Sequence, residues 1–251
     1  PAELAQAPGL GNLHRRDHRR AERPRYAGGV RALGWLCPEL RVKSILPFAF
    51  TSLPLSSTMT LKGTSMSKQE ELDALAKEVE ACEECKKDKI GGAVFGEGNP
   101  DAIVAFIGEA PGKQEAKVGR PFIGPSGKLL RKTIRDVLGL DDMKDVYITS
   151  PVKYLPERGT PSKKDIDHAR THFDRQLAIV NPKIVVLMGA VAAQAVLNEK
   201  VAVTSVHGTV LERDGRKYFI TVHPAAGLRY PPMQETFQED FQKLKEVLAE
   251  I

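Results

Sequence analysis

Residues 102–112 read AIVAFIGEAPG, and this short stretch gives the clearest structural signal in the chain. Its first six residues are all apolar, which is the length and character of a strand buried on both faces of a sheet. A glycine-rich turn that contains Glu109 follows at once. Residues 146–149 and 184–188 have the composition of two further short strands. We therefore predict a sheet that is covered on both faces.

Helical patterns separate these strands. Apolar residues recur at helical spacing in four segments, at residues 72–82, 130–138, 166–180 and 237–248, and Gly189 is expected to open a short helix through Leu197. Asn181-Pro182 should end the third helix, and Asp214-Gly215 predicts the tight turn of a hairpin between residues 209–211 and 218–222. This alternation predicts an α/β protein, a three-layer α/β/α sandwich with a central, mostly parallel sheet of about four strands.

The charge of the chain is unevenly distributed. The 251 residues carry a formal net charge of +5, but residues 1–65 hold ten Lys/Arg against four Asp/Glu, and the rest hold 27 against 28. Charge alone thus gives no support for nucleic-acid binding by residues 66–251. We predict that residues 1–65 are a basic extension, disordered or non-native. A capping box at Ser67 and Glu70 predicts the first helix, and Met66 just before it would serve as a natural start.

Composition excludes two further classes. The sequence has no uninterrupted run of about 18 apolar residues, so we predict no membrane-spanning helix. Three cysteines are too few to stabilise a fold of this size by disulfide bonds. This favours a reducing compartment over a disulfide scaffold.

Three chemically rich segments follow predicted strands, where the carboxyl ends of parallel strands place binding sites. The first contains Glu109 and continues through Glu115 to a Gly/Pro-rich turn around Phe122, in which Ser126 is expected to cap the next helix. Ser150 opens the second segment. The third begins with His223 and projects Leu228 and Arg229 from what we expect to be a loop.

The sequence resembles the family-4 uracil-DNA glycosylases in the order and spacing of several stretches. These are residues 108–112, Glu115, residues 119–122 and residues 223–226. The resemblance covers about residues 67–248 and marks residues 66–251 as a uracil-DNA glycosylase-like domain. It implies a DNA repair enzyme that flips uracil out of DNA and hydrolyses its N-glycosidic bond. Glu109 and His223 would be catalytic. The implied base-binding residues are Gly108, Ala110, Glu115, Phe122 and Ser150. Leu228 and Arg229 match the loop that fills the duplex after the base leaves.

The sequence departs from the family at two places. Ser150 stands where family members usually have an asparagine that reads the uracil edge, so we expect altered base selectivity. The family also usually binds a [4Fe–4S] cluster through four cysteines, of which Cys82 and Cys85 match the first two. Tyr154 and Ala169 take the other two positions, His168 and His172 are judged poor substitutes, and we expect no cofactor.

Other functions stay open at this stage. They are a non-catalytic binder of damaged DNA, a glycosylase of altered base specificity, a relative that traps its product covalently, and an unrelated α/β nucleotide-binding enzyme. We expect the partner to be uracil-containing DNA, single- or double-stranded, and we expect no association with a membrane. We expect a cytoplasmic monomer that is associated with the nucleoid when it acts on DNA.

Overall fold

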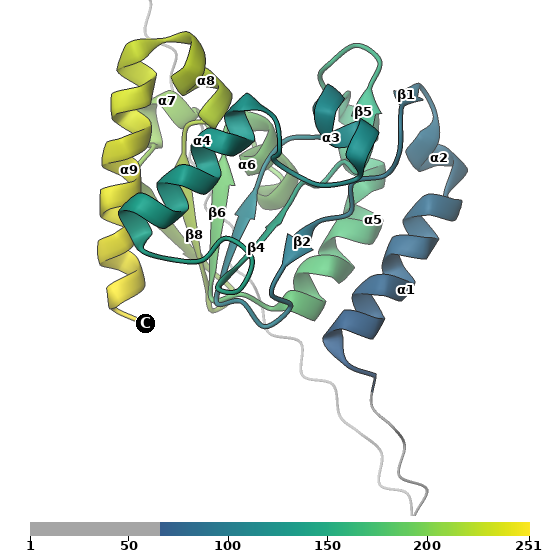
Figure 1. Cartoon of the computed structure of the whole chain (residues 1–251), viewed down its shortest axis with the longest axis horizontal. Helices are drawn as coiled ribbons and strands as arrows, with labels where there is room; N and C mark the ends of the chain where they lie inside the picture. Colours follow the sequence, from purple (N-terminus) through teal and green to yellow (C-terminus); the bar gives the residue numbers. More distant parts are fainter. Residues whose placement is uncertain (1–65) are drawn as a thin grey trace, which may run out of the picture. The chain divides into compact units, whose positions relative to one another are not determined.

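A computed structural model describes residues 66–251, and the prediction for residues 1–65 lies outside this range. In the described part, six strands form the central sheet in the order β2-β4-β3-β6-β8-β7 (Figure 1). Their bounds are β2 Glu97–Gly98, β3 Val104–Ile107, β4 Val146–Thr149, β6 Ile184–Met188, β7 Thr209–Arg213 and β8 Arg216–Thr221. The predicted mixed α/β class with a mostly parallel sheet is confirmed.

The four inner strands, β4, β3, β6 and β8, run parallel, and β2 and β7 add antiparallel edges. Every residue of β3, β4 and β6 is buried. The register pairs Ile107 with both Thr149 and Leu187, and Leu187 with Ile220. The carboxyl ends of β3, β4 and β8 therefore open at the same edge of the sheet.

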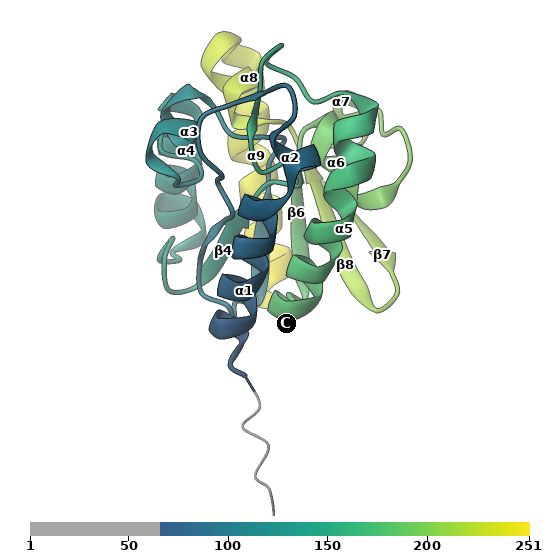
Figure 2. The ribbon, with the colours of Figure 1, turned by 90° about the vertical axis from the view of Figure 1, so that its right-hand side faces the viewer.

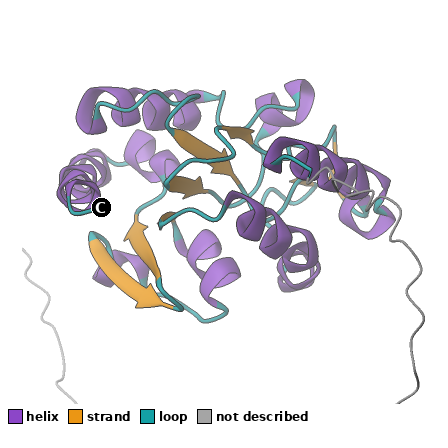
Figure 3. Ribbon diagram, turned by 90° about the horizontal axis from the view of Figure 1, so that it is seen from below, coloured by secondary structure: helices purple, strands orange, loops and turns teal. Residues whose placement is uncertain are grey.

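Helices cover both faces of this sheet (Figure 3). One face carries α4 Pro125–Thr133, the π-helical turn η1 Ile134–Leu138, α8 Pro224–Arg229 and α9 Pro231–Ala249. The other carries α1 Lys68–Ala81, α5 Lys163–Val180 and α6 Ala190–Leu197, with α1 and α5 side by side in Figure 2. The remaining short elements are α2 Glu83–Lys86, α3 Lys113–Val118, α7 Val203–Val206, and the strands β1 Lys89–Ile90 and β5 Leu155–Pro156, which pair with each other.

Local sequence signals account for most helix ends. Ser67 and Glu70 form the expected capping box at the start of α1. Asn181 ends α5 in the left-handed conformation, and the hairpin turn at Asp214 and Gly215 has positive φ at both residues, as predicted. The expected cap at Ser126 is wrong, because Gly124 is the N-cap of α4 and Pro125 begins the helix.

Aromatic packing between the sheet and α9 forms the centre of the core. Phe106 of β3 stacks on Phe241 with ring centroids 5.8 Å apart, and Phe237 lies 4.5 Å from Phe241. All three rings are fully buried. This packing joins the last helix to the middle of the sheet. Among residues 66–251, no helix is long and apolar enough to cross a membrane.

Candidate active site

The ends of three parallel strands contribute to one cleft. Glu109 follows β3 by two residues, Ser150 follows β4 directly, and His223 lies two residues beyond β8. All three line a single open cleft together with Phe122 and Arg229. The structure thus brings the residues of the three predicted segments together, because parallel neighbours open at one edge of the sheet.

Phe122 forms a rigid wall of the cleft. It is buried and has a φ of 52°, which is uncommon for a residue with a side chain. Two glycines make room for it: a Cβ on Gly108 would lie 2.4 Å from its ring, and one on Gly127 would lie 2.0 Å from its carbonyl carbon. The Nε of Arg131 donates to the Phe122 carbonyl at 2.9 Å. The ring centroid lies 6.2 Å from that of His223.

Glu115 stabilises the turn that presents this ring. Its side chain is buried, and its Oε1 accepts hydrogen bonds from the backbone N–H groups of Ile123 at 2.9 Å and Gly124 at 2.8 Å. This carboxylate therefore satisfies two backbone donors next to Phe122. The geometry favours the role of loop support that the sequence left open, although Glu115 also borders the cleft.

His223 is held in one tautomer. Its Nδ1 accepts a hydrogen bond from the backbone N–H of Ala225 at 3.1 Å, which caps α8. The single proton of a neutral imidazole is therefore on Nε2. Burial, assisted by the positive charge of Arg229, lowers the pKa of His223 to about 4. At neutral pH this side chain is an uncharged hydrogen-bond donor at the wall of the cleft.

Glu109 has a different environment. Its side chain is half-buried at the cleft, and burial raises the pKa of its carboxyl group above the ordinary value. Within residues 66–251, no hydrogen bond engages this carboxylate. A carboxylate without a protein partner, with a raised pKa, is suited to accept a proton from a water molecule.

A buried lysine, which the sequence analysis missed, supports the segment at Ser150. The Nζ of Lys153 donates to the carbonyl of Ser150 at 2.6 Å, to Thr149 Oγ1 at 2.8 Å and to the carbonyl of Phe95 at 3.0 Å. Burial places the pKa of Lys153 well below its usual range. Lysines are mostly exposed, so no pattern in the sequence marks this one.

Leu228 and Arg229 belong to a helix, so the expectation of a loop is wrong. Pro224 begins α8 and His223 caps it, which favours a helical turn over a loop. The Leu228 side chain is exposed although it is apolar, and Arg229 borders the cleft. Tyr230, which the sequence analysis did not single out, is also exposed at the cleft.

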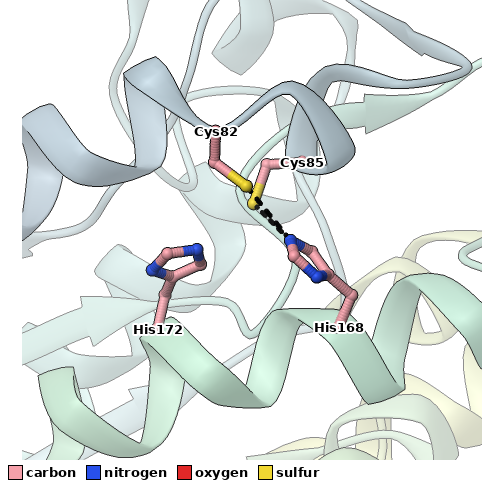
Figure 4. Close-up of side chains that lie close together, drawn as sticks. All are labelled: Cys82, Cys85, His168 and His172. Atoms are coloured by element: carbon pink, nitrogen blue, oxygen red, sulfur yellow. Dashed lines mark hydrogen bonds between the residues drawn. The ribbon is translucent and has the colours of Figure 1, made fainter.

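A second cluster of chemically active side chains lies away from the cleft. Cys82 and Cys85, around the start of α2, face His168 and His172 of α5, and their ligand atoms all lie within 4.8 Å of one another (Figure 4). These four side chains could hold a metal ion. The two cysteines that match the family pattern are thus joined by the two histidines that the sequence analysis judged poor substitutes.

Helix geometry explains how the two histidines come together. His168 and His172 are four residues apart, so they share one face of α5 and point to the same place. Ala169, the position that the resemblance assigned to a ligand, lies about 100° around the helix from His168. Its methyl group packs with Val152 and Ile166 and borders the same hollow as the two histidines, but it offers no ligand atom. Tyr154 is buried and borders a different hollow.

The fold and the cleft together define the class of protein as the uracil-DNA glycosylase superfamily, whose family model matches residues 95–249. A type-4 uracil-DNA glycosylase of Saccharolobus solfataricus is 38% identical over 188 residues, which cover 71% of this chain and 87% of that protein. The type-4 enzyme of Sulfurisphaera tokodaii is 36% identical over 186 residues (70% and 84%), and that of Archaeoglobus fulgidus is 35% identical over 188 residues (71% and 94%). The chain belongs to this superfamily and, within it, to the type-4 uracil-DNA glycosylase family.

Proposed function

We propose that this protein is a base-excision repair enzyme that removes uracil from DNA by hydrolysing the N-glycosidic bond of the flipped nucleotide. The observation that carries the proposal is the presence of Glu109, Phe122 and His223 in one open cleft at the ends of the strands. The names and coverage of the type-4 relatives support the substrate.

The cleft residues match the charges that develop during this reaction. When the bond between base and sugar breaks, the electron pair leaves with the base, so negative charge grows on the base oxygens. The Nε2–H of neutral His223 donates to that charge, as a preorganised oxyanion donor does. Because the donor is already uncharged and fixed, no proton has to be placed on it before the reaction.

Positive charge grows on the sugar at the same time. The Glu109 carboxylate balances this charge and accepts a proton from the water molecule whose oxygen adds to the sugar carbon. Its raised pKa makes it a stronger base than an exposed glutamate. Phe122 supplies a flat apolar face on which the flipped base stacks, next to Gly108 and Ala110.

The rim of the cleft supports binding of the DNA itself. Leu228 is an exposed apolar side chain that would fill the space left in the duplex, and Arg229 would pair with a neighbouring phosphate. We propose that the enzyme acts as a monomer on chromosomal DNA in the cytoplasm, on single or double strands.

One observation favours a variant of this function. Ser150, buried at the cleft, offers one rotatable hydroxyl to the base edge, whereas an asparagine would offer both a donor and an acceptor. A glycosylase that also accepts bases other than uracil is therefore the second candidate. A non-catalytic damage binder agrees less well with the structure, because such a protein has no need for an unpartnered carboxylate and a fixed imidazole donor.

The experiment is to incubate the full-length protein with uracil-containing single- and double-stranded oligonucleotides and to measure free uracil. We expect release by the wild type and a large loss in Glu109→Gln. Glu239→Gln, on the exposed side of α9, is the matched control and should retain activity. DNA binding without base release, or a covalent protein–DNA product, would contradict the proposal.

A further inference from the structure

The four-ligand cluster, Cys82, Cys85, His168 and His172, has the ligand spacing of a zinc site. The thiols are separated by two residues and the imidazoles by three, which gives the pattern C-x₂-C followed by H-x₃-H. The cysteines come from the junction of α1 and α2, and the histidines come from the facing side of α5 (Figure 4). The two pairs thus reach one point from opposite sides.

The distances in the cluster are those of ligands around one ion. His168 Nε2 lies 3.2 Å from Cys82 Sγ and 3.3 Å from Cys85 Sγ, and all four ligand atoms lie within 4.8 Å of each other. A tetrahedral zinc ion, with bonds of about 2.3 Å to sulfur and about 2.0–2.1 Å to nitrogen, places its ligand atoms roughly 3.3–3.8 Å apart. Small adjustments of the side chains would therefore admit a single ion.

The iron–sulfur cluster that the family resemblance implies does not fit these residues. A [4Fe–4S] cluster is held by four cysteine thiolates, one on each iron. Residues 66–251 contain only Cys82 and Cys85, and the positions assigned to the other two ligands hold Tyr154 and Ala169. Ligands bound to four separate iron atoms also stand farther apart than ligands of one ion.

A [2Fe–2S] centre with two cysteines and two histidines agrees no better. In such a centre the thiolates bind one iron and the imidazoles bind the other. Each histidine nitrogen is then remote from the sulfur ligands. Here His168 Nε2 is within 3.3 Å of both sulfur atoms. This contact fits two kinds of ligand around one centre.

His172 adds an independent observation. Its Nδ1 is buried and has no hydrogen-bond partner among the described residues. Buried polar atoms are nearly always satisfied, so one without a partner calls for an explanation. No protein hydrogen bond through Nδ1 therefore holds this ring, and a bond between the imidazole and an ion would hold it in place.

We propose that Cys82, Cys85, His168 and His172 bind a single Zn²⁺ ion in tetrahedral geometry. Two thiolates and two neutral imidazoles cancel the charge of the ion, and its binding releases the two thiol protons. Two ion pairs lie beside the site, Lys89 with Asp165 at 2.5 Å and Lys164 with Glu84 at 2.8 Å, and the buried Lys153 borders the same hollow.

The role of this ion is structural. Four protein ligands leave no open position for a water molecule or a substrate. None of the four side chains lines the catalytic cleft among the residues described there. The ion would instead tie the chain between α1 and α2 to α5. The proposal therefore does not depend on the reaction that the cleft performs.

The test uses the full-length protein, purified without oxygen from cells supplied with both iron and zinc. We expect about one zinc per chain, no iron and a colourless solution. X-ray absorption at the zinc edge should show two sulfur neighbours at about 2.3 Å and two nitrogen neighbours at about 2.0–2.1 Å. This measurement needs no variant, so a folding defect cannot obscure it.

Variants then assign the ligands. Cys85→Ser and His172→Asn should each lose most of the bound zinc, whereas Cys37→Ser, which alters the third cysteine of the chain, should keep it. A brown protein with about four irons per chain would overturn the proposal. Wild-type protein without metal, a zinc environment without nitrogen, or zinc retained in both ligand variants would also overturn it.

Discussion

The cleft and the four-ligand cluster are built in opposite ways. The cleft collects residues that follow parallel strands within one or two positions, so Glu109, Ser150 and His223 reach it from three strand ends. The cluster collects residues from a helix junction and from one face of α5, so it depends on which helix residues carry a ligand atom. In the cleft, Glu109 faces open space without a protein partner, whereas the cluster ligands face one another. From this difference we expect the cleft residues to act in the reaction and the cluster residues to stabilise the folded protein.

The largest expected effects follow from replacing one histidine by alanine in each of the two regions. His223→Ala should lower kcat/KM for uracil release by roughly 30- to 1,000-fold, or about 2–4 kcal/mol, because it removes a fixed donor to the leaving base. His168→Ala should instead lower the melting temperature by about 5 °C or more, since each kcal/mol lost shifts it by a few degrees.

Single-turnover base release and thermal unfolding of the two variants provide the measurement. Activity should be compared at a temperature at which both variants are folded. If His168→Ala then loses as much activity as His223→Ala, the expectation that the cluster serves stability and not the reaction is wrong.

The pH dependence should separate His223 from Glu109 within the cleft. Because the folded pKa of His223 is lowered to about 4, the unfolded chain binds a proton first as the pH falls below 6.5. The wild type should therefore lose about 3 kcal/mol of stability relative to His223→Gln between pH 6.5 and pH 4, and should regain it as the pH rises. Denaturant unfolding of both proteins at several pH values checks this. Parallel curves for the two proteins would show that His223 is not buried in its neutral form.

At acidic pH, activity should fall because Glu109 is protonated. Since the pKa of Glu109 is raised, protonation of its carboxylate should produce the acidic limb of the kcat/KM profile, while His223 is still neutral. Glu109→Gln should leave a low rate without this limb. An acidic limb that persists in the variant would assign the limb to another group.

A smaller effect, on base selectivity, is expected at Ser150 of the cleft. Ser150→Asn should increase discrimination between uracil and cytosine by about 1–3 kcal/mol, because an amide makes two hydrogen bonds to a base edge. The ratio of kcat/KM values for the two bases measures it, and Ser126→Asn on another part of the cleft wall is the control. A wild type that already rejects cytosine and hypoxanthine strictly, with no gain in Ser150→Asn, would mean that other groups read the base.

The smallest effect should follow removal of residues 1–65. Both regions lie entirely within residues 66–251, so the shortened protein should retain uracil release and bound metal. Activity measured at several salt concentrations is the check. If the shortened protein is insoluble or loses most of its activity at moderate salt, the arginines of the extension contribute phosphate contacts.

The sequence was sufficient to predict the cleft but insufficient to predict the cluster. Strand runs and the turns after them identify Glu109 and Ser150 without side-chain detail, because the sheet alone brings them together. At the cluster, His168 and Ala169 are neighbours in the chain but lie about 100° apart around the helix axis. Both positions border the hollow beside Cys85, and only the folded chain shows that the imidazole of His168 reaches the two sulfur atoms.

Other differences have equally local causes. The edge strand β2 has only two residues, so no alternation of apolar side chains marks it. Leu228 was expected in a loop, but a proline after a capping histidine begins a helix of six residues there. Lys153 was missed because its burial depends on carbonyl groups that only the folded chain brings around it.

The wall formed by Phe122 has a consequence for how this cleft tolerates sequence change. Its shape depends on two places where the chain has no side chain, since even a methyl group at Gly108 would meet the ring and one at Gly127 would meet the backbone behind it. Here the harmful substitutions are those that add atoms. A larger residue at either position would displace Phe122 and change the shape of the cleft, although every catalytic group would still be present.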